Sequence, residues 1–117
     1  MIEIVRSGEL ATAESVPGIT RDEAFEDRGV LFGRTRVEAG ATSAWHDHGR
    51  REFYGFLMSG SLRLDTKDES VDLHDGDYFH IPVGLAHRYV NPDDNVEAVV
   101  IEIVLGEGPA YVNVAWP

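Results

Sequence analysis

Hydrophobic and polar residues alternate with a period of two in several short stretches of this 117-residue chain. Leu62-Arg63-Leu64-Asp65 is the clearest case, and such alternation predicts a strand with one buried face. The strands expected from the pattern are residues 30–37, 42–46, 53–58, 62–65, 71–73, 78–81, 86–90, 98–105 and 111–116. Turn residues recur between these stretches at roughly ten-residue spacing, which is typical of an all-β sandwich or barrel.

The first thirty residues show a weaker pattern. Ile2-Glu3-Ile4-Val5 predicts a short strand, and a turn-rich stretch follows it as far as Asp27. Within that stretch only residues 21–27 fit a helical turn. The chain shows no internal repeat, low-complexity tract or linker, and its length fits one domain over residues 1–117.

Two runs of metal-ligand residues lie about forty positions apart on the predicted strands. They read Gly40-x5-His46-x-His48-x3-Glu52 and Gly76-x5-Pro82-x-Gly84-x2-His87-x3-Asn91. His46 and His48 leave the same face of a strand because they are two residues apart, and Glu52 has the same parity. A Pro-x-Gly turn directs the strand of His87 back towards the first run. Three imidazoles and a carboxylate that meet inside a barrel suit Fe, Mn, Ni, Cu or Zn better than Ca or Mg.

These two runs resemble the two motifs of the cupins, a superfamily of small β-barrel proteins. The second motif, G-x5-P-x-G-x2-H-x3-N, is matched position for position at residues 76–91. The first, G-x5-H-x-H-x3,4-E-x6-G, is matched from Gly40 through Glu52, but seven residues instead of six separate Glu52 from Gly60. The extra residue predicts a β-bulge, and Gly55 is the expected place because bulges favour glycine.

The resemblance implies a single jelly-roll (cupin) β-barrel, with the first motif at 40–60 and the second at 76–91. It also implies one divalent transition-metal ion, with His46, His48, Glu52 and His87 as its ligands. Such a set leaves two positions of an octahedral ion open to exchangeable water. Glu52 is further expected to act as a base. His80 is a candidate proton shuttle beside the site, and its alternative is an ordinary core or surface histidine.

Several neighbours of the motifs have plainer interpretations. Asn91 is expected to tie down turn backbone through its amide. Arg50 and Arg51 lie between His48 and Glu52 and are candidates for binding an anionic substrate, with a surface loop as the alternative. Arg34 and Arg36 share one strand face and are open to the same two interpretations.

The charge balance restricts the partners. Twenty-one acidic residues against ten basic ones give a formal net charge of -11, which repels nucleic acid and anionic lipid. A halophilic source would account for it, because salt screens the self-repulsion of an anionic surface. The absence of cysteine excludes disulfides and thiolate zinc sites. Without a signal-like start or a membrane-length apolar run, a cytoplasmic protein with no membrane partner is expected.

Two functions remain open at this stage. The resemblance favours a small metal-dependent enzyme, of dioxygenase, isomerase, lyase or decarboxylase type, that acts on a small organic molecule inside the barrel. The alternative is a non-catalytic protein that binds a small ligand for sensing or storage, since a fold does not fix a reaction. Cupins commonly dimerise through sheet edges or outer barrel faces, and the apolar strand at residues 2–5 agrees with a homodimer.

Overall fold

The computed structural model describes residues 1–116, and its regular elements are almost all β-strands. They are η1 (Ser7–Glu9, a short 3-10 helix), β1 (Ala11–Val16), β2 (Ile19–Asp27), β3 (Val30–Val37), β4 (His46–Asp47), β5 (Glu52–Ser59), β6 (Ser61–Asp65), β7 (Ser70–His74), β8 (Tyr78–Ile81), β9 (Arg88–Val90), β10 (Ala98–Leu105) and β11 (Val112–Asn113). In the part of the chain so described, no helix has the length and apolar character that a membrane crossing requires.

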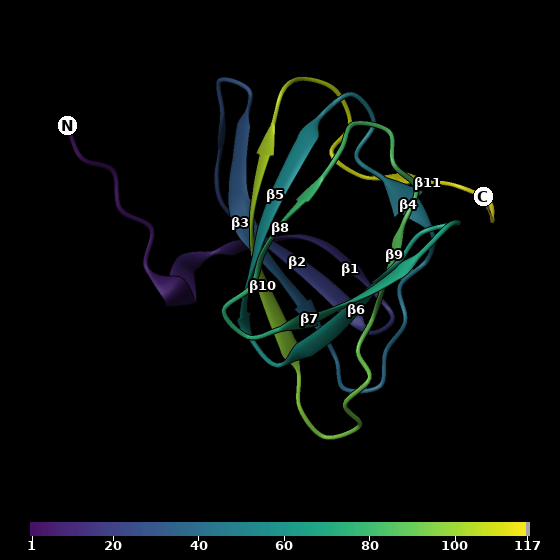
Figure 1. Ribbon diagram of the computed structural model, residues 1–117. Coiled ribbons are helices and arrows are strands. Elements are labelled where there is room, and N and C mark those ends of the chain that lie inside the picture. The colour runs from purple at the N-terminus through teal and green to yellow at the C-terminus, as the bar shows by residue number, and fades with distance from the viewer. Residues whose placement is uncertain (117) are drawn as a thin grey trace.

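The strands form three antiparallel sheets. A six-stranded sheet has the order β1-β2-β3-β10-β5-β8, a three-stranded sheet the order β7-β6-β9, and β11 pairs with β4. Figure 1 shows the three-stranded sheet lying across the larger one. The expected all-β jelly-roll architecture is confirmed. Since β1 and β8 end the large sheet, the barrel has a seam along each of these strands.

The core lies between the sheets, and the alternation of each strand decides which side chains enter it. In β10, residues 98, 100, 102 and 104 are buried, and the residues between them face outward. One buried cluster joins Val37, Leu57 and Val100 of the large sheet to Leu62 and Leu73 of the small one. A second cluster contains Leu31, Phe53, Ile81 and Val104. The two faces of the large sheet are therefore chemically different in β3, β5 and β10.

The strands expected at 30–37, 78–81 and 98–105 match β3, β8 and β10 residue for residue. The helical turn at residues 21–27 is wrong, because these residues belong to β2 and pair with β3. Gly18, with φ of 82°, completes the tight turn that joins β1 to β2, so a hairpin replaces the expected turns.

The strand expected at residues 2–5 is also wrong. These residues form an irregular arm that projects from the barrel in Figure 1, and Ile2 is 88% exposed. Hydrophobic alternation makes a strand only where a sheet edge is available to pair with it, and none of the described strands pairs with the arm.

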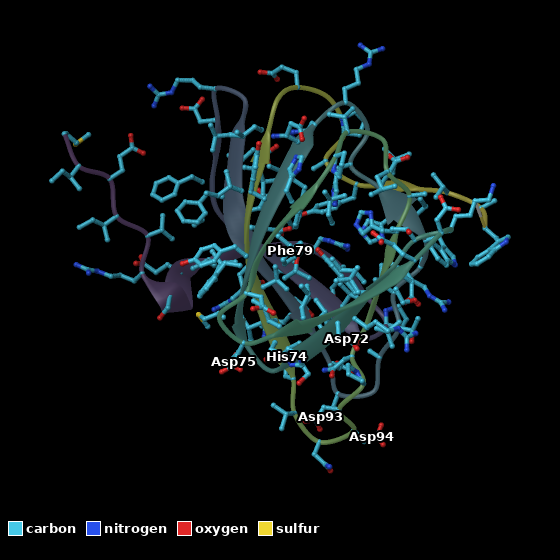
Figure 2. All side chains as sticks on the ribbon, in the orientation of Figure 1. Asp72, His74, Asp75, Phe79, Asp93 and Asp94 are labelled. Atoms are coloured by element: carbon cyan, nitrogen blue, oxygen red, sulfur yellow. The ribbon has the colours of Figure 1, made fainter. Side chains whose placement is uncertain are left out.

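The bulge is in β5, but at a different residue from the expected one. Val99 of β10 pairs with Ser59, and the next residue, Val100, pairs with Leu57. Met58, between Leu57 and Ser59, is therefore the extra residue of β5. Gly55 remains in register, opposite Phe79 of β8. A Cβ atom on Gly55 would lie 2.4 Å from Cζ of Phe79, whose position in the barrel Figure 2 shows. Close approach of this aromatic ring, and not a bulge, is what requires glycine there.

Candidate metal centre

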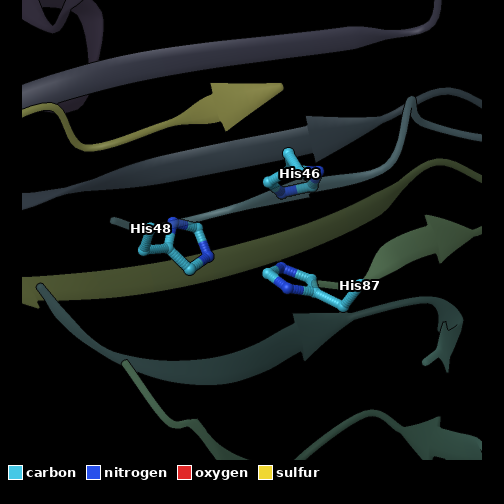
Figure 3. A group of neighbouring side chains, drawn as sticks. All are labelled: His46, His48 and His87. Atoms are coloured by element: carbon cyan, nitrogen blue, oxygen red, sulfur yellow. The ribbon is translucent and has the colours of Figure 1, made fainter. Parts of the chain in front are cut away.

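His46 and His87 come from the two motifs and lie directly opposite each other. They form an antiparallel bridge in which each backbone N–H donates to the other residue's carbonyl at 2.9 Å. His48 follows two residues after His46, on the same side of the chain. Figure 3 shows the three imidazoles facing a common space between the strands. This backbone pairing explains how histidines about forty positions apart are brought together.

Each of the three rings has its orientation fixed by one backbone carbonyl. Nδ1 of His46 lies 2.9 Å from the carbonyl oxygen of Ala44. Nδ1 of His48 lies 2.8 Å from the carbonyl oxygen of Ala110, and Nδ1 of His87 lies 2.8 Å from that of Leu85. Because a carbonyl only accepts, Nδ1 carries the proton in each ring and Nε2 keeps its lone pair. The three Nε2 atoms are buried without a hydrogen-bond partner.

The free lone pairs converge, since the candidate ligand atoms of His46, His48 and His87 all lie within 4.8 Å of one another. Burial lowers the pKa of His46 and of His48 to about 3, and it also lowers that of His87. The charge of Arg21 lowers the pKa of all three rings further. The triad therefore stays neutral at ordinary pH, which is the form that binds metal. A donor set of three neutral imidazoles fits a divalent transition metal.

Aromatic rings surround the triad. Phe53 stacks on His48 with ring centroids 4.4 Å apart, and Tyr111 meets the same imidazole edge-on at 5.6 Å. Tyr89 contacts both His46 and His87 at 5.9 Å. These contacts restrict the rotation of the imidazoles, so the three Nε2 atoms are held in fixed positions.

The structure does not bring Glu52 to this group. Its side chain is 42% exposed on the outer face of β5, and one carboxylate oxygen lies 2.5 Å from Nε2 of His80. Residues 53, 55 and 57 of β5 are buried, so the alternation of the strand turns Glu52 outward. The geometry therefore separates Glu52 from the three histidines, and His80, stacked on Tyr54, lies beside Glu52 outside the barrel.

Comparison with known proteins identifies the architecture. The family model for the cupin domain matches residues 33–104. This chain belongs to the cupin family. Many solved structures are similar to this cupin, and three of them are enzymes with different activities. RemF, a polyketide cyclase from Streptomyces resistomycificus, is 18% identical, with a TM-score of 0.81 over 100% of this chain and 88% of its own.

The other two structures are longer chains. A sugar phosphate isomerase of the cupin superfamily, from Silicibacter pomeroyi, is 21% identical over 78% of this chain, with a TM-score of 0.68. An oxalate oxidase in complex with the substrate analogue glycolate is 29% identical over 74% of it, with a TM-score of 0.63. The present cupin covers 61% of the isomerase chain and 46% of the oxidase chain.

The position of Glu52 could have been anticipated from the spacing of the first cupin motif. That motif allows four residues between the second histidine and the acidic position, as well as three. If four residues follow His48, the acidic position of the motif falls on Phe53. The six residues that the motif then requires lead to Gly60. Phe53 is the residue that faces the triad in the structure. This cupin thus carries phenylalanine where the longer spacing places the acid.

The sequence analysis missed a buried carboxylate, Glu102, in the middle of β10. It is 1% exposed, and its Oε1 accepts hydrogen bonds from the hydroxyls of Thr35 and Tyr111, each at 2.9 Å. Burial and the Glu102 charge raise the pKa of Tyr111 and of Tyr89, so both phenols stay protonated. The signal was available, because Glu102 interrupts an apolar run and has the parity of the buried Val100 and Val104.

A second missed residue is Arg21 of β2. It is 5% exposed, and its guanidinium carbon lies 4.1 Å from the centre of the Tyr111 ring. The sequence analysis expected a helical turn at residues 21–27 and so did not predict that Arg21 points inward. Its inward orientation follows from its position in a strand, β2. Arg21 is therefore an interior cation near the triad.

Three of the four arginines that were candidates for binding a substrate make structural contacts instead. Arg34 and Arg36 each lie 3.0 Å from Asp22 in ion pairs of the large sheet. Arg51 donates to the carbonyl oxygens of Val104 and Gly108, which ties down the connection after β10, whereas Arg50 is exposed. The amide of Asn91 donates to three backbone carbonyls, as expected; these belong to Val37, Glu38 and Val96.

Two cavities touch the triad, one near each seam of the barrel. The first, of about 80 Å³, is lined by Arg21, His46, Tyr111 and Asn113 among others. The second, of about 140 Å³, lies between β8 and the sheet of β6 and β7 and reaches His87. Its lining is mostly apolar and includes Val71, Phe79 and Leu85. A small molecule thus has a charged chamber on one side of the histidines and an apolar one on the other.

Proposed function

We propose that this cupin binds one divalent transition-metal ion through Nε2 of His46, His48 and His87 and acts with it as an enzyme on a small organic molecule. The observation that carries the proposal is the convergence of three buried lone pairs, each fixed by a hydrogen bond at the opposite ring nitrogen. Carbonyl partners at Nδ1 are the usual support of metal-bound histidines. Iron, manganese, nickel, zinc and copper all suit imidazole ligands.

A three-histidine site leaves coordination positions for water and a ligand, so the ion would act as a Lewis acid or take part in oxygen chemistry. The residues of the chain supply the surroundings. Burial keeps the imidazoles neutral, and Phe53 and Tyr89 shield them from water. The Tyr111 hydroxyl, which donates to Glu102, holds a proton inside the barrel. The apolar cavity beside His87 gives an organic molecule a place to bind.

The solved structures give this proposal its range. RemF is a cyclase, the protein from Silicibacter pomeroyi an isomerase, and the third an oxidase with glycolate as a substrate analogue. Enzymes with different reactions therefore share this barrel, which supports catalysis and leaves the reaction class open. The second candidate, a non-catalytic binder of a small ligand, rests on the same histidines and the same cavities.

The test is elemental analysis of protein purified without a histidine tag, followed by a screen of small organic substrates that includes oxygen uptake. We expect one equivalent of a transition metal per chain and turnover that depends on it. Stoichiometric metal without turnover on a broad panel would favour the binder. Protein that takes up no iron, manganese, nickel, zinc or copper on reconstitution contradicts both forms of the proposal.

We also propose that the protein forms a homodimer. The irregular arm exposes Ile2 and Ile4, and the outer face of the large sheet exposes Phe32 and Met58. These two apolar surfaces would be covered by a second copy related by a two-fold axis. Light scattering in high salt tests this assembly, and a mass near that of one 13.0 kDa chain at every concentration contradicts it.

A further inference from the structure

The outer face of the large sheet carries a groove with an almost entirely apolar lining. Its volume is about 300 Å³, larger than that of either cavity that touches the triad. Ala24 of β2, Phe32 of β3, Met58 of β5 and Ile101 of β10 line this outer groove, together with Leu10 from the segment before β1. Apolar side chains on a surface are stabilised when another apolar group covers them.

The apolar surface extends beyond the outer groove. Six large side chains on the same face of β3, β5, β8 and β10 are 37% to 80% exposed; they are Val30, Phe32, Tyr54, Met58, Tyr78 and Ile103. Large side chains have about 150–250 Å² of surface each, so these fractions, with those of Ile2 and Ile4, amount to roughly 700–900 Å² per copy. A stable interface buries about 800 Å² on each partner, so this surface has the area that a dimer needs.

The arm formed by residues 1–6 begins beside the outer groove and leads away from it. Ser7, the next residue, belongs to the groove lining. The backbone N–H of Glu9 donates to the Arg6 carbonyl at 2.8 Å, and the Arg6 N–H donates to the Glu9 carboxylate at 3.1 Å. These two bonds fix the turn at which the arm leaves the barrel, and Figure 1 shows the arm projecting outward. To enter the groove of its own copy, the arm would have to reverse at this turn.

The arm has the length and the pattern to cover a groove of this kind. Ile2 and Ile4 are two residues apart, so both side chains leave the same side of an extended segment. Six extended residues span roughly 20 Å, the length of an average strand. The two isoleucines are 88% and 62% exposed, so their apolar surface is open to a partner.

The charges allow two copies of this acidic protein to meet at the outer groove. Arg34 is the charged residue among the described residues that line it, and Arg34 and Arg36 both pair with the carboxylate of Asp22. In the arm, Glu3 is balanced by Arg6. The contact therefore brings no excess of acidic groups together, in contrast to the net charge of -11 that opposes other approaches of two copies.

We propose that the arm of one copy lies in the outer groove of a second copy, with Ile2 and Ile4 against Phe32 and Met58, and that a two-fold axis makes the exchange mutual. The inference rests on the proposed homodimer and adds to it the segment that holds the two copies together. A two-fold interface is self-complementary, so each copy donates one arm and offers one groove.

The first test measures the association of the copies by analytical ultracentrifugation in high salt, which screens the repulsion between acidic chains. Ile2→Ser/Ile4→Ser should weaken the dimer by at least about 100-fold, because both isoleucines of each arm lose their apolar contacts. Val83→Ser/Val96→Ser is the matched control. These two valines are exposed but do not line the outer groove, so the dissociation constant should not change. Thermal melting checks that both variants fold.

The second test uses the absence of cysteine, since any disulfide must then join introduced residues. Oxidised Ile4→Cys/Ala24→Cys protein should migrate as two linked chains, and peptide mass spectrometry should find a disulfide between positions 4 and 24. Ile2→Cys/Ala24→Cys tests the neighbouring position of the arm. Ile4→Cys/Val83→Cys is the control and should give no disulfide between positions 4 and 83.

The outcomes separate the exchange from the homodimer. Unchanged affinity in Ile2→Ser/Ile4→Ser protein overturns the exchange and leaves the homodimer in place. The exchange is also overturned if a dimeric protein forms neither disulfide with position 24, or forms it within single chains, because the arm would then cover its own groove. Unaltered protein that keeps the mass of one chain at every concentration contradicts the homodimer itself, and the exchange with it.

Discussion

Two groups of ionisable residues flank strand β5, one on each face, and their histidines differ in every property that matters for binding a metal. Inside the barrel, the three imidazoles of His46, His48 and His87 are buried, and each Nδ1 is paired with a carbonyl. Outside it, His80 is 43% exposed and pairs with Glu52. The comparison teaches that parity along a strand, and not proximity in sequence, decides which side chains reach the interior group.

The largest contrast is expected in metal binding. His87→Ala removes one of three converging ligands and should weaken the affinity for a divalent metal by about 100-fold or more. His80→Ala, on the outer face, should leave one metal ion per chain. Elemental analysis after dialysis against a weak chelator measures both. Retention of a full equivalent by His87→Ala protein would show that the triad is not the site.

Stability should differ between two neighbouring aromatic residues of β5. Phe53 is fully buried against His48, so Phe53→Ala should lower the free energy of unfolding by about 3–5 kcal/mol. Tyr54 is 45% exposed on the other face, and Tyr54→Ala should cost less than about 1 kcal/mol. Urea unfolding of the metal-free variants measures the difference. Equal costs would mean that the two faces of the strand are not inner and outer as described.

The pH dependence of the metal-free protein should report the buried triad. The folded-state pKa of His46 and of His48 is about 3, well below the usual 6.5, so only the unfolded chain binds protons between these values. Stability is therefore greatest above pH 6.5 and falls as the pH drops towards 3, with a slope that approaches about 1.4 kcal/mol per pH unit for each histidine.

Urea unfolding at pH 7, 6, 5 and 4.5 measures this slope in a range where most unfolded-state carboxyls are still ionised. His48→Gln should reduce this slope by the contribution of one histidine, about 1.4 kcal/mol per pH unit. The carboxyl pKa of Asp22 and that of Asp65 are lowered in the folded state, mainly by their arginine partners, so their effect appears only at lower pH. Constant stability from pH 7 to 5 would contradict a buried, neutral triad.

The sequence predicted the histidines of the two motifs well and the interior residues outside the motifs poorly. His46, His48 and His87 were found from motif spacing, because strand parity and the turn before His87 fix their directions locally. Glu52 was assigned one position away from the inward residue, and one residue is enough to reverse a side chain in a strand. Strands β3, β8 and β10 were predicted to the residue, and each of them begins and ends close to glycine, proline or acidic residues that mark turns.

The failures have a common physical cause. Arg21 and Glu102 share the parity of buried neighbours in β2 and β10, but only the side-by-side order of β2, β3 and β10 shows that they lie in one interior. Ile2 and Ile4 carry an alternating pattern but find no edge to pair with. Local alternation thus predicts which residues share a face of a strand. The order of the strands in the sheet decides which residues that face packs against.

The smallest effect is expected for the outer pair. Glu52→Gln removes the charge beside His80 on a surface open to solvent, and it should change the free energy of unfolding by no more than about 0.5–1 kcal/mol. Metal content should be unchanged, since the carboxylate does not face the triad. Loss of the bound metal in this variant would place Glu52 among the ligands after all.

Crystallography of the Co²⁺-loaded protein, with data collected at the cobalt absorption edge, tests the central claim most directly. The account predicts a single anomalous peak per chain at about 2.0–2.2 Å from Nε2 of His46, His48 and His87, with the Glu52 carboxylate still turned towards His80. A peak between Glu52 and His80, or cobalt bound by fewer than three of the interior histidines, would contradict it.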